Sequence, residues 1–211
     1  MSSHHKPIDK LMDCQHVKRW TMVGTTVESN VASHSFNVAM IAMAIFKRMR
    51  NIGDATEEQV CYFALLHDVD EAETGDMPTP TKKAIRKAGV EPNGLYCTQG
   101  LVPVPCASVA AIIKMADLVE NYLFIKEHGT GARARWAASD VRERLDGAMA
   151  TVPGDLARAA HWVMDYIERR RSDEEQERTD IKEATKRRSY LVPLTLPPVV
   201  DREPRDSLRS A

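Results

Sequence analysis

The sequence has no long apolar run and almost no net charge, and each absence excludes a class of protein. No stretch approaches the roughly 20 consecutive apolar residues that span a bilayer, and the N-terminal MSSHHKPIDK has no apolar signal region. The net charge of −1 gives no general attraction to nucleic acids or acidic membranes. We therefore expect a cytoplasmic protein without a membrane partner.

Cysteines are few and widely spaced. Cys14, Cys61, Cys97 and Cys106 form no Cys-x-x-Cys pair, and a closed structural zinc site would favour such thiolates. Cys14 and Cys61 lie in helical patterns and fit small core residues in a reducing compartment. For the other two, a Cys97–Cys106 disulfide is the alternative, which the cytoplasmic character of the chain disfavours.

Convincing strand patterns and internal repeats are also lacking. Apolar residues recur at helical spacing instead, so we expect an all-α fold. Thr56 and Gln59 have the spacing of a capping box, and Gly89 is a suitable helix stop. The expected helices span residues 7–22, about 33–50, 56 to the His67-Asp68 pair, a basic stretch ending at 89, about 106–128, 133–151 and 154–172, with a loop at 90–105.

The composition changes near residue 173. Dense alternating charge begins there and is followed by the proline-rich run LVPLTLPPVV at 191–200. The length of 211 residues suits one domain, residues 1–172, followed by an extended tail, residues 173–211. The charged part of the tail either extends the last helix or stays solvated, and the proline-rich run could lie along a neighbouring subunit.

The most informative segment is residues 65–80, LLHDVDEAETGDMPTP, which is rich in acidic and metal-ligating side chains. His67 and Asp68 follow an apolar helical run. Glu71 comes four residues after His67 and would share its face if the helix continued that far. Such polar groups are costly to leave without partners at the end of a buried helix, and a cation would remove that cost.

Two other predicted helices offer ligands of the same kind. His34 lies near the start of one, and Asp117 lies among apolar residues of another. With His67 and Asp68 they make a mixed nitrogen and oxygen set, which suits a divalent transition metal such as cobalt, manganese, zinc, iron or nickel. Such a metal can activate water and polarise a phosphoryl oxygen. Considered singly, the side chain of His34 could form its hydrogen bonds with nearby backbone groups at the start of the helix, and Asp117 could be a charge on the helix surface.

Five motifs follow one another between about residues 15 and 128. They are Arg19-Trp20, Asn30-Val-Ala-Ser-His34-Ser, His67-Asp68-x-x-Glu71, Thr74-Gly-Asp76-Met-Pro-Thr-Pro and Lys114-x-Ala-Asp117. Their order resembles the HD-domain phosphohydrolases, specifically the bacterial 5′-deoxynucleotidase branch. The resemblance implies a helical HD-domain bundle and a homo-oligomer in a bacterial cell or phage-infected host. It also implies a metal held by His34, His67, Asp68 and Asp117.

The same resemblance implies roles for other residues. Glu71 would position or activate the attacking water, and Asp68 is counted with it as catalytic. Arg19 would bind phosphate through its planar guanidinium, and Trp20 would lie near the nucleoside. Without the family resemblance, these two residues would fit a surface arginine beside a core tryptophan equally well. Asp76 would be placed to sense the sugar of the nucleotide. Alternatively, its side chain could cap the helix that follows.

Further substrate-binding residues are expected around this group. Thr79 belongs to the motif that contains Asp76. Lys82 lies close to the expected site and Lys114 shares a helix face with Asp117, so both could contact phosphate oxygens. The alternative for Lys82 is a solvated first helical turn.

Two departures from the family pattern bear on the substrate. Ser29 and Ser33 stand where the family commonly has acidic residues, and the segment between Asp68 and Asp117 is shorter than in the bacterial nucleotidases. The compact form is similar to the phage dATP triphosphohydrolases. We therefore expect hydrolysis at the 5′-phosphate of a small-molecule deoxynucleotide, with a dNTP such as dATP yielding deoxynucleoside and triphosphate.

Two other functions remain open at this point. One is a dNMP 5′-nucleotidase that releases phosphate, and the other is a non-catalytic nucleotide-sensing module with the same site. Glu71 beside a complete ligand set disfavours the sensor. A stable nucleic-acid partner is not expected, because acidic residues balance the basic ones and no recognition motif occurs.

Overall fold

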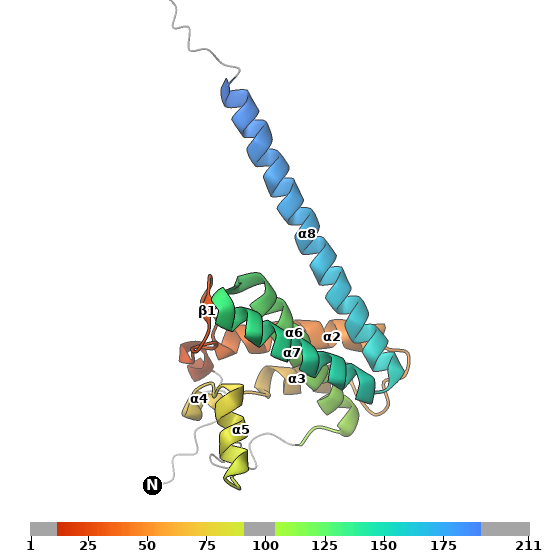
Figure 1. Cartoon of the computed structure of the whole chain (residues 1–211). Coiled ribbons are helices and arrows are strands. Elements are labelled where there is room, and N and C mark those ends of the chain that lie inside the picture. Colours follow the sequence, from red (N-terminus) through yellow and green to blue (C-terminus); the bar gives the residue numbers. More distant parts are fainter. Residues whose placement is uncertain (1–11, 91–103, 191–211) are drawn as a thin grey trace, which may run out of the picture. The chain divides into compact units, whose positions relative to one another are not determined.

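The computed structural model of the protein describes residues 12–90 and 104–190. Within these ranges the regular secondary structure is helical apart from one small sheet and an isolated β-bridge, which confirms the all-α prediction (Figure 1). No helix of the described ranges is long and apolar enough to span a membrane. The helical elements are η1 (Cys14–His16), α2 (Val31–Arg48), α3 (Glu57–Leu66), α4 (Glu71–Thr74), α5 (Thr79–Lys87), α6 (Ala107–His128), α7 (Gly131–Thr151) and α8 (Gly154–Tyr190).

The local sequence decides where α2 and α3 begin. The side chain of Asn30 accepts a hydrogen bond from the backbone N–H of Ser33 at 2.8 Å, and the Ser33 hydroxyl accepts one from the backbone N–H of Asn30 at 3.3 Å. Thr56 and Gln59 form the same reciprocal pair at the start of α3, as their spacing predicted. These two caps define the start of the helix that carries His34 and of the helix that leads into the His67-Asp68 pair.

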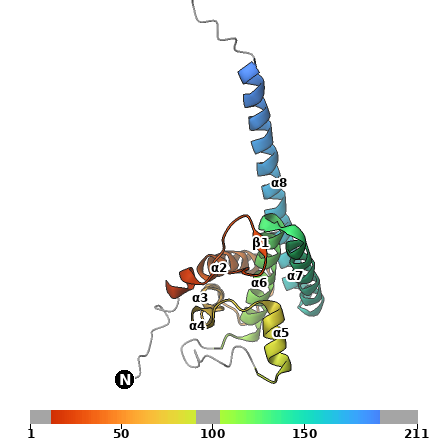
Figure 2. The ribbon, with the colours of Figure 1, turned by 60° about the vertical axis from the view of Figure 1, so that its left-hand side comes forward.

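The helix α6 is the centre of the bundle, with α2 and α3 to one side and α7 to the other (Figure 2). Its apolar stripe is buried, since Val109, Ile112, Ala116 and Val119 have no exposed surface. Burial of these side chains is the main force that holds the helices together. Polar residues elsewhere on α6 are thereby carried into the interior of the protein.

The predicted first helix, residues 7–22, is wrong beyond His16. The 3-10 turn η1 ends there, and Val17 has an extended backbone. Lys18 then forms an isolated antiparallel bridge with Asn30. Long-range backbone pairing replaces helical hydrogen bonds here, and residues 7–11 lie outside the described part of the chain.

A short sheet closes the region after this bridge. The strand β1 (Gly24–Thr25) pairs antiparallel with β2 (Gly129–Thr130), with Gly24 opposite Thr130. The backbone N–H of Thr26 adds a 2.8 Å hydrogen bond to the carbonyl oxygen of His128. The pairing therefore ties the segment before α2 to the C-terminal end of α6.

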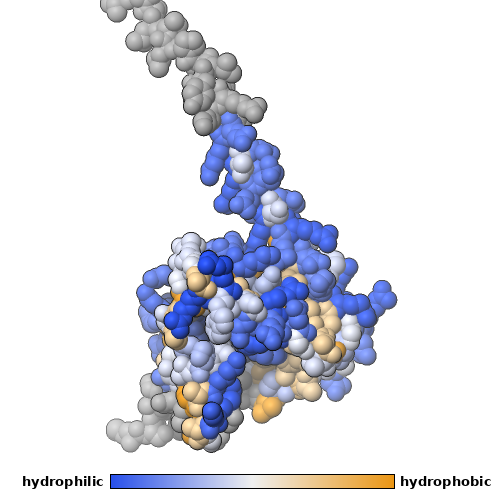
Figure 3. Space-filling view, viewed as in Figure 1, coloured by the Kyte–Doolittle hydropathy of each residue, from blue (hydrophilic) through white to orange (hydrophobic). Residues whose placement is uncertain are grey.

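The chain divides into two compact units, residues 1–168 and 169–211. The first turns of α8 belong to the first unit, where Leu156, Ala160 and Val163 are buried. In the second unit the helix continues to Tyr190, so the charged segment is helical, and hydrophilic side chains dominate its surface (Figure 3). The predicted domain boundary at residues 172 and 173 stays a prediction, and the proline-rich run at 191–200 lies outside the described residues.

Candidate active site

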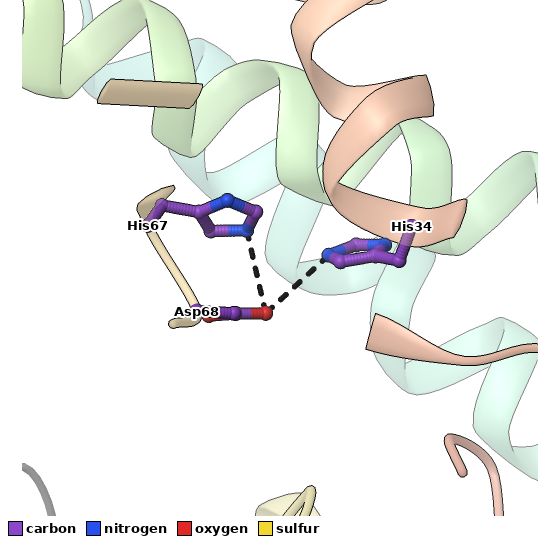
Figure 4. Close-up of side chains that lie close together, drawn as sticks. All are labelled: His34, His67 and Asp68. Atoms are coloured by element: carbon purple, nitrogen blue, oxygen red, sulfur yellow. Dashed lines mark ion pairs between the residues drawn. The ribbon is translucent and has the colours of Figure 1, made fainter. Parts of the chain in front are cut away.

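Three of the predicted metal ligands come together from two parts of the chain. His34 projects from the first turn of α2, and His67 and Asp68 follow directly after α3 (Figure 4). The Oδ2 atom of Asp68 lies 3.5 Å from Nε2 of His34 and 3.3 Å from Nε2 of His67. One ligand atom from each residue lies within 4.8 Å of the other two, so a single ion could contact all three.

The fourth predicted ligand, Asp117, approaches from α6. Its Oδ1 atom lies 3.5 Å from Nε2 of His34. Oδ1 also accepts a 2.6 Å hydrogen bond from the side-chain amide of Asn121, and Oδ2 accepts a 2.9 Å bond from Nζ of Lys114. Asp117 therefore faces the group from inside the bundle, and its alternative reading as a surface charge is wrong. Its role as a ligand stays a prediction.

Both histidine rings are oriented to receive a cation. Nδ1 of His34 lies 2.7 Å from Oε2 of Glu120, and Nδ1 of His67 lies 2.7 Å from the backbone carbonyl oxygen of Ala64. With neutral rings, each Nδ1–H donates to this oxygen, and each Nε2 directs its lone pair toward Asp68.

The two Nε2 atoms also provide a test of fit for a metal. Both are buried, and neither has a hydrogen-bond partner among the described residues. Unpaired buried polar atoms are costly, and a divalent metal with nitrogen and oxygen ligands would remove that cost. The side chains present therefore fit the predicted class of ion.

Electrostatic interactions within the group favour ionised carboxylates. Burial alone would raise the pKa of Asp68, but His67, His34 and Arg19 hold that pKa well below its usual range. Burial also opposes ionisation of Asp117, yet the close approach of His34 keeps its pKa low. For His34, burial and Arg19 lower the pKa, and the surrounding carboxylates outweigh them and raise it to about 10 in the metal-free protein.

Glu71 reaches the group from a separate helix. The helix α3 ends at Leu66, directly before the histidine–aspartate pair as predicted, and Glu71 begins α4, so Glu71 and His67 do not share one helical face. Its Oε1 accepts a 2.9 Å hydrogen bond from Lys82, and its Oε2 lies 3.7 Å from Nη1 of Arg19. Burial, followed by the charges of Asp68 and Asp76, raises the pKa of Glu71 to about 7. A carboxylate with this pKa can accept a proton from water near neutral pH.

Arg19 lies inside the protein, with a side chain that is only 8% exposed. Its backbone N–H donates to the carbonyl oxygen of Ser29 at 2.9 Å. Its guanidinium donates to Oδ2 of Asp68 at 3.1 Å and to Oδ1 of Asn121 at 2.9 Å. The alternative of a surface arginine is therefore wrong, and the positive charge stands directly beside the ligand group.

A cavity of about 660 Å³ opens next to these residues. Trp20 lines it and stacks on Phe124 with ring centres 6.0 Å apart. Trp20 has a φ of 59°, a left-handed conformation that is rare for bulky residues and occurs here where the chain turns toward β1. The same cavity is lined by the other predicted substrate-binding residues, which are Arg19, Asp76, Thr79, Lys82 and Lys114.

Two alternatives raised by the sequence are excluded by the geometry. The helix α5 begins after Pro78 without any side-chain cap, so Asp76 does not cap it. Lys82 is bonded to Glu71 and only 27% exposed, so it is not a solvated residue. For the Cys97–Cys106 disulfide, Cys97 lies outside the described residues.

Known proteins with similar sequences converge on one family. A family model described as 5′-deoxynucleotidase YfbR-like matches residues 8–89. The dATP triphosphohydrolase of Salmonella phage PMBT28 is 34% identical over 144 residues, which are 64% of this chain and 74% of the relative. This chain belongs to the HD-domain phosphohydrolase family.

Other relatives match shorter parts of the chain. The dATP triphosphohydrolase of Cyanophage S-2L is 34% identical over 122 residues, covering 56% of this chain and 69% of the relative. A 5′-deoxynucleotidase of Erwinia tasmaniensis is 38% identical over 68 residues, covering 31% of this chain and 34% of the relative. A solved structure, the Cyanophage S-2L HD phosphohydrolase bound to dA and one catalytic Zn²⁺ ion, superposes with a TM-score of 0.60 at 23% identity. It covers 81% of this chain and 98% of the other, and it supports the HD fold.

The HD site also contains residues that sequence reasoning missed. Glu120 holds His34, and Asn121 contacts both Arg19 and Asp117. These two residues come three and four positions after Asp117, so helical spacing could have placed them on the same face. A second missed set lies on α7, where no local signal points to the cavity; it comprises Arg133, Trp136, Asp140 and Arg144.

Proposed function

We propose that this HD phosphohydrolase cleaves the 5′-phosphate ester of deoxynucleotides in a reaction that depends on a divalent metal. The observation that carries the proposal is the pair of buried Nε2 atoms, of His34 and His67, that face the carboxylate of Asp68 and have no hydrogen-bond partner in the described part of the chain. Asp117 would complete the ligand set. Relatives that are named for hydrolysis of deoxynucleotides support the substrate class.

Each remaining side chain has a defined task in this reaction. When bound, the metal supplies Lewis acidity toward the phosphoryl group and the water. Glu71 accepts a proton from the attacking water at Oε2, the oxygen that lacks a hydrogen-bond partner among the described residues. Arg19 and Lys82 bring positive charge to the phosphate oxygens. The water oxygen forms a bond to the α-phosphorus, and the bond from this phosphorus to the 5′ oxygen breaks as that oxygen takes up a proton.

We further propose that the substrate is a deoxynucleoside triphosphate, with dATP as the leading candidate, and that the products are deoxynucleoside and triphosphate. The two phage relatives named dATP triphosphohydrolase match this chain over a longer stretch than the 5′-deoxynucleotidase of Erwinia tasmaniensis does. Lys82 and Lys114 add positive charge to the cavity. Hydrolysis of a dNMP with release of phosphate is the second candidate.

The test is a panel of all dNTPs and dNMPs with protein loaded with zinc, cobalt or manganese. Nucleoside should appear from at least one substrate. Glu71→Gln should keep its metal and lose about 10²- to 10⁴-fold in turnover, whereas His67→Ala should lose the metal. Glu73→Gln, an exposed site on the same short helix, serves as the matched control and should behave as the wild type.

The outcomes separate the functions. Tight nucleotide binding without any product would favour the sensor, and no nucleoside from any substrate with all three metals would refute the enzymatic proposal. The predicted homo-oligomer is tested independently by sedimentation of the full chain and of a chain that ends at Arg171.

A further inference from the structure

One face of α7 forms a wall of the cavity that the metal-ligand group also lines. The side chains that line the cavity recur every three or four residues, as expected for one face of a helix. This wall consists of Arg133, Trp136, Ala137, Asp140, Val141 and Arg144.

The wall changes in character along its length. In the first half of α7, Arg133 is followed by an apolar part of the wall, where Ala137 packs in a cluster with Trp20 and Val23 beside the expected nucleoside position. Towards its other end the helix presents Asp140 and Arg144, so that end is polar. A ligand with an apolar ring and a charged chain could place its ring against the apolar part of the wall and its chain against the charged residues that follow.

The polar end of the wall faces α5. Nη1 of Arg144 lies 3.5 Å from the hydroxyl oxygen of Thr79 and 3.8 Å from Oδ2 of Asp140. Nζ of Lys83 lies 3.9 Å from Oδ1 of the same aspartate. One carboxylate is thus shared by two cations at distances near the limit of an ion pair, which leaves an excess of one positive charge.

Of the two cations, Arg144 is the one that can bind a ligand in the cavity. Arg144 lines the cavity, whereas the side chain of Lys83 is 67% exposed and can balance Asp140 from outside. A planar guanidinium with only long contacts keeps donors available for a phosphate, which forms stronger, charge-assisted hydrogen bonds.

The position of Arg144 along the cavity suits the end of a phosphate chain. The helices α6 and α7 run antiparallel on either side of the short strand β2 (Figures 1 and 2). Arg144 of α7 and Lys114 of α6 line the same cavity. Lys114 pairs with Asp117 next to the expected α-phosphate. On the α5 side, Lys82 and Arg86 line the same cavity.

We infer that Arg144, on the α7 wall, binds the terminal phosphates of a nucleoside triphosphate and gives the site its preference for triphosphates over monophosphates. The inference rests on the proposed function for its nucleotide, but the binding of the phosphate chain can be measured separately. Arg144 determines specificity and takes no part in bond cleavage, because the bond that breaks lies at the α-phosphate.

The matched variants are Arg144→Gln and Arg142→Gln. Arg142 lies on the same helix but turns away, with its Nε donating to Asp146 at 3.0 Å and its guanidinium 5.3 Å from the ring centre of Tyr122. In metal-loaded protein, Arg144→Gln should lower kcat/KM for the accepted dNTP about 10- to 100-fold and leave dNMP hydrolysis within about twofold. Arg142→Gln should change neither.

A binding measurement decides the inference even if no substrate is turned over. Inorganic tripolyphosphate, supplied as its magnesium complex so that it does not strip the bound metal, is titrated calorimetrically against orthophosphate. Wild type and Arg142→Gln should bind tripolyphosphate more tightly than orthophosphate, and Arg144→Gln should lose most of that difference.

The two proposals fail in different ways. Tripolyphosphate binding that depends on Arg144, without hydrolysis of any nucleotide, would refute the proposed function and support the inference. Equal tripolyphosphate affinity in wild type and Arg144→Gln, or no preference over orthophosphate in wild type, would overturn the inference whatever the activity.

Discussion

Replacing Glu120 with glutamine should weaken metal binding while leaving the fold intact. Oε2 of Glu120 lies 2.7 Å from Nδ1 of His34, and Oε1 accepts a 3.4 Å hydrogen bond from Asn37. Both side chains of the Glu120–His34 pair are buried, so solvent does not screen their interaction. Glutamine can keep an oxygen beside the ring, but it cannot supply the charge that makes the imidazole a stronger ligand.

The expected magnitude follows from this geometry. Loss of a carboxylate that orients a metal-binding histidine lowers metal affinity about 10- to 100-fold, which is about 1.4–2.7 kcal/mol. We expect a loss of metal affinity in the upper half of this range, because a buried charge-assisted hydrogen bond is roughly twice as strong as a neutral one. Competition with a chromogenic chelator on zinc- or cobalt-loaded protein measures the change.

Glu127→Gln is the control for this experiment, since Glu127 is on the same helix and its side chain is 41% exposed. It should retain the wild-type affinity. Far-UV circular dichroism and thermal unfolding of the metal-free variants show whether the fold is kept. A folded Glu120→Gln protein with wild-type metal affinity would refute the role assigned to Glu120.

Three further predictions concern stability. Thr56→Ala removes the cap of α3 and should lower the free energy of unfolding by about 1 kcal/mol in urea titrations. Leu145→Ala creates a cavity at a fully buried position and should cost about 2–5 kcal/mol in the same assay. In the metal-free protein the pKa of His34 is raised to about 10, above its unfolded value near 6.5. Its proton therefore stabilises the fold fully below about pH 6.5, and this stability should be lost as the pH rises through 10, as urea titrations at pH 7 and pH 10 can measure.

Each of these has a contrary result. A wild-type midpoint for Thr56→Ala would mean that packing alone sets the start of α3. A cost below about 1 kcal/mol for Leu145→Ala would mean that the core collapses to fill the space. If His34→Asn has the same decrease in stability between pH 7 and pH 10 as the wild type, the decrease comes from other groups.

The helices that could be predicted are those with local signals. The capping box of Thr56 and Gln59, the stop at Gly89 and the apolar stripe of α6 all occur as the sequence indicates. The prediction of the first helix failed because the backbone of Lys18 pairs with that of Asn30, which is distant in sequence, and does not form helical hydrogen bonds. Helical periodicity depends only on residues that are close in sequence, so it does not reveal backbone pairing between distant segments.

The candidate site divides in the same way. His34, His67, Asp68 and Asp117 could be named from their chemistry, and three of them lie close enough to share an ion. The end of α3 beside the histidine–aspartate pair was predicted, whereas the separate short helix that begins at Glu71 was not.

By itself, the sequence determined that the chain is helical and which side chains could bind a metal and activate water, because caps, periodicity and ligand chemistry are properties of short segments. Only the tertiary structure decided that Arg19 is buried beside Asp68, that Glu120 holds His34, and that α7 closes the cavity with Arg144. These arrangements arise where helices distant in sequence pack against each other around a common core, and packing of this kind leaves no local trace.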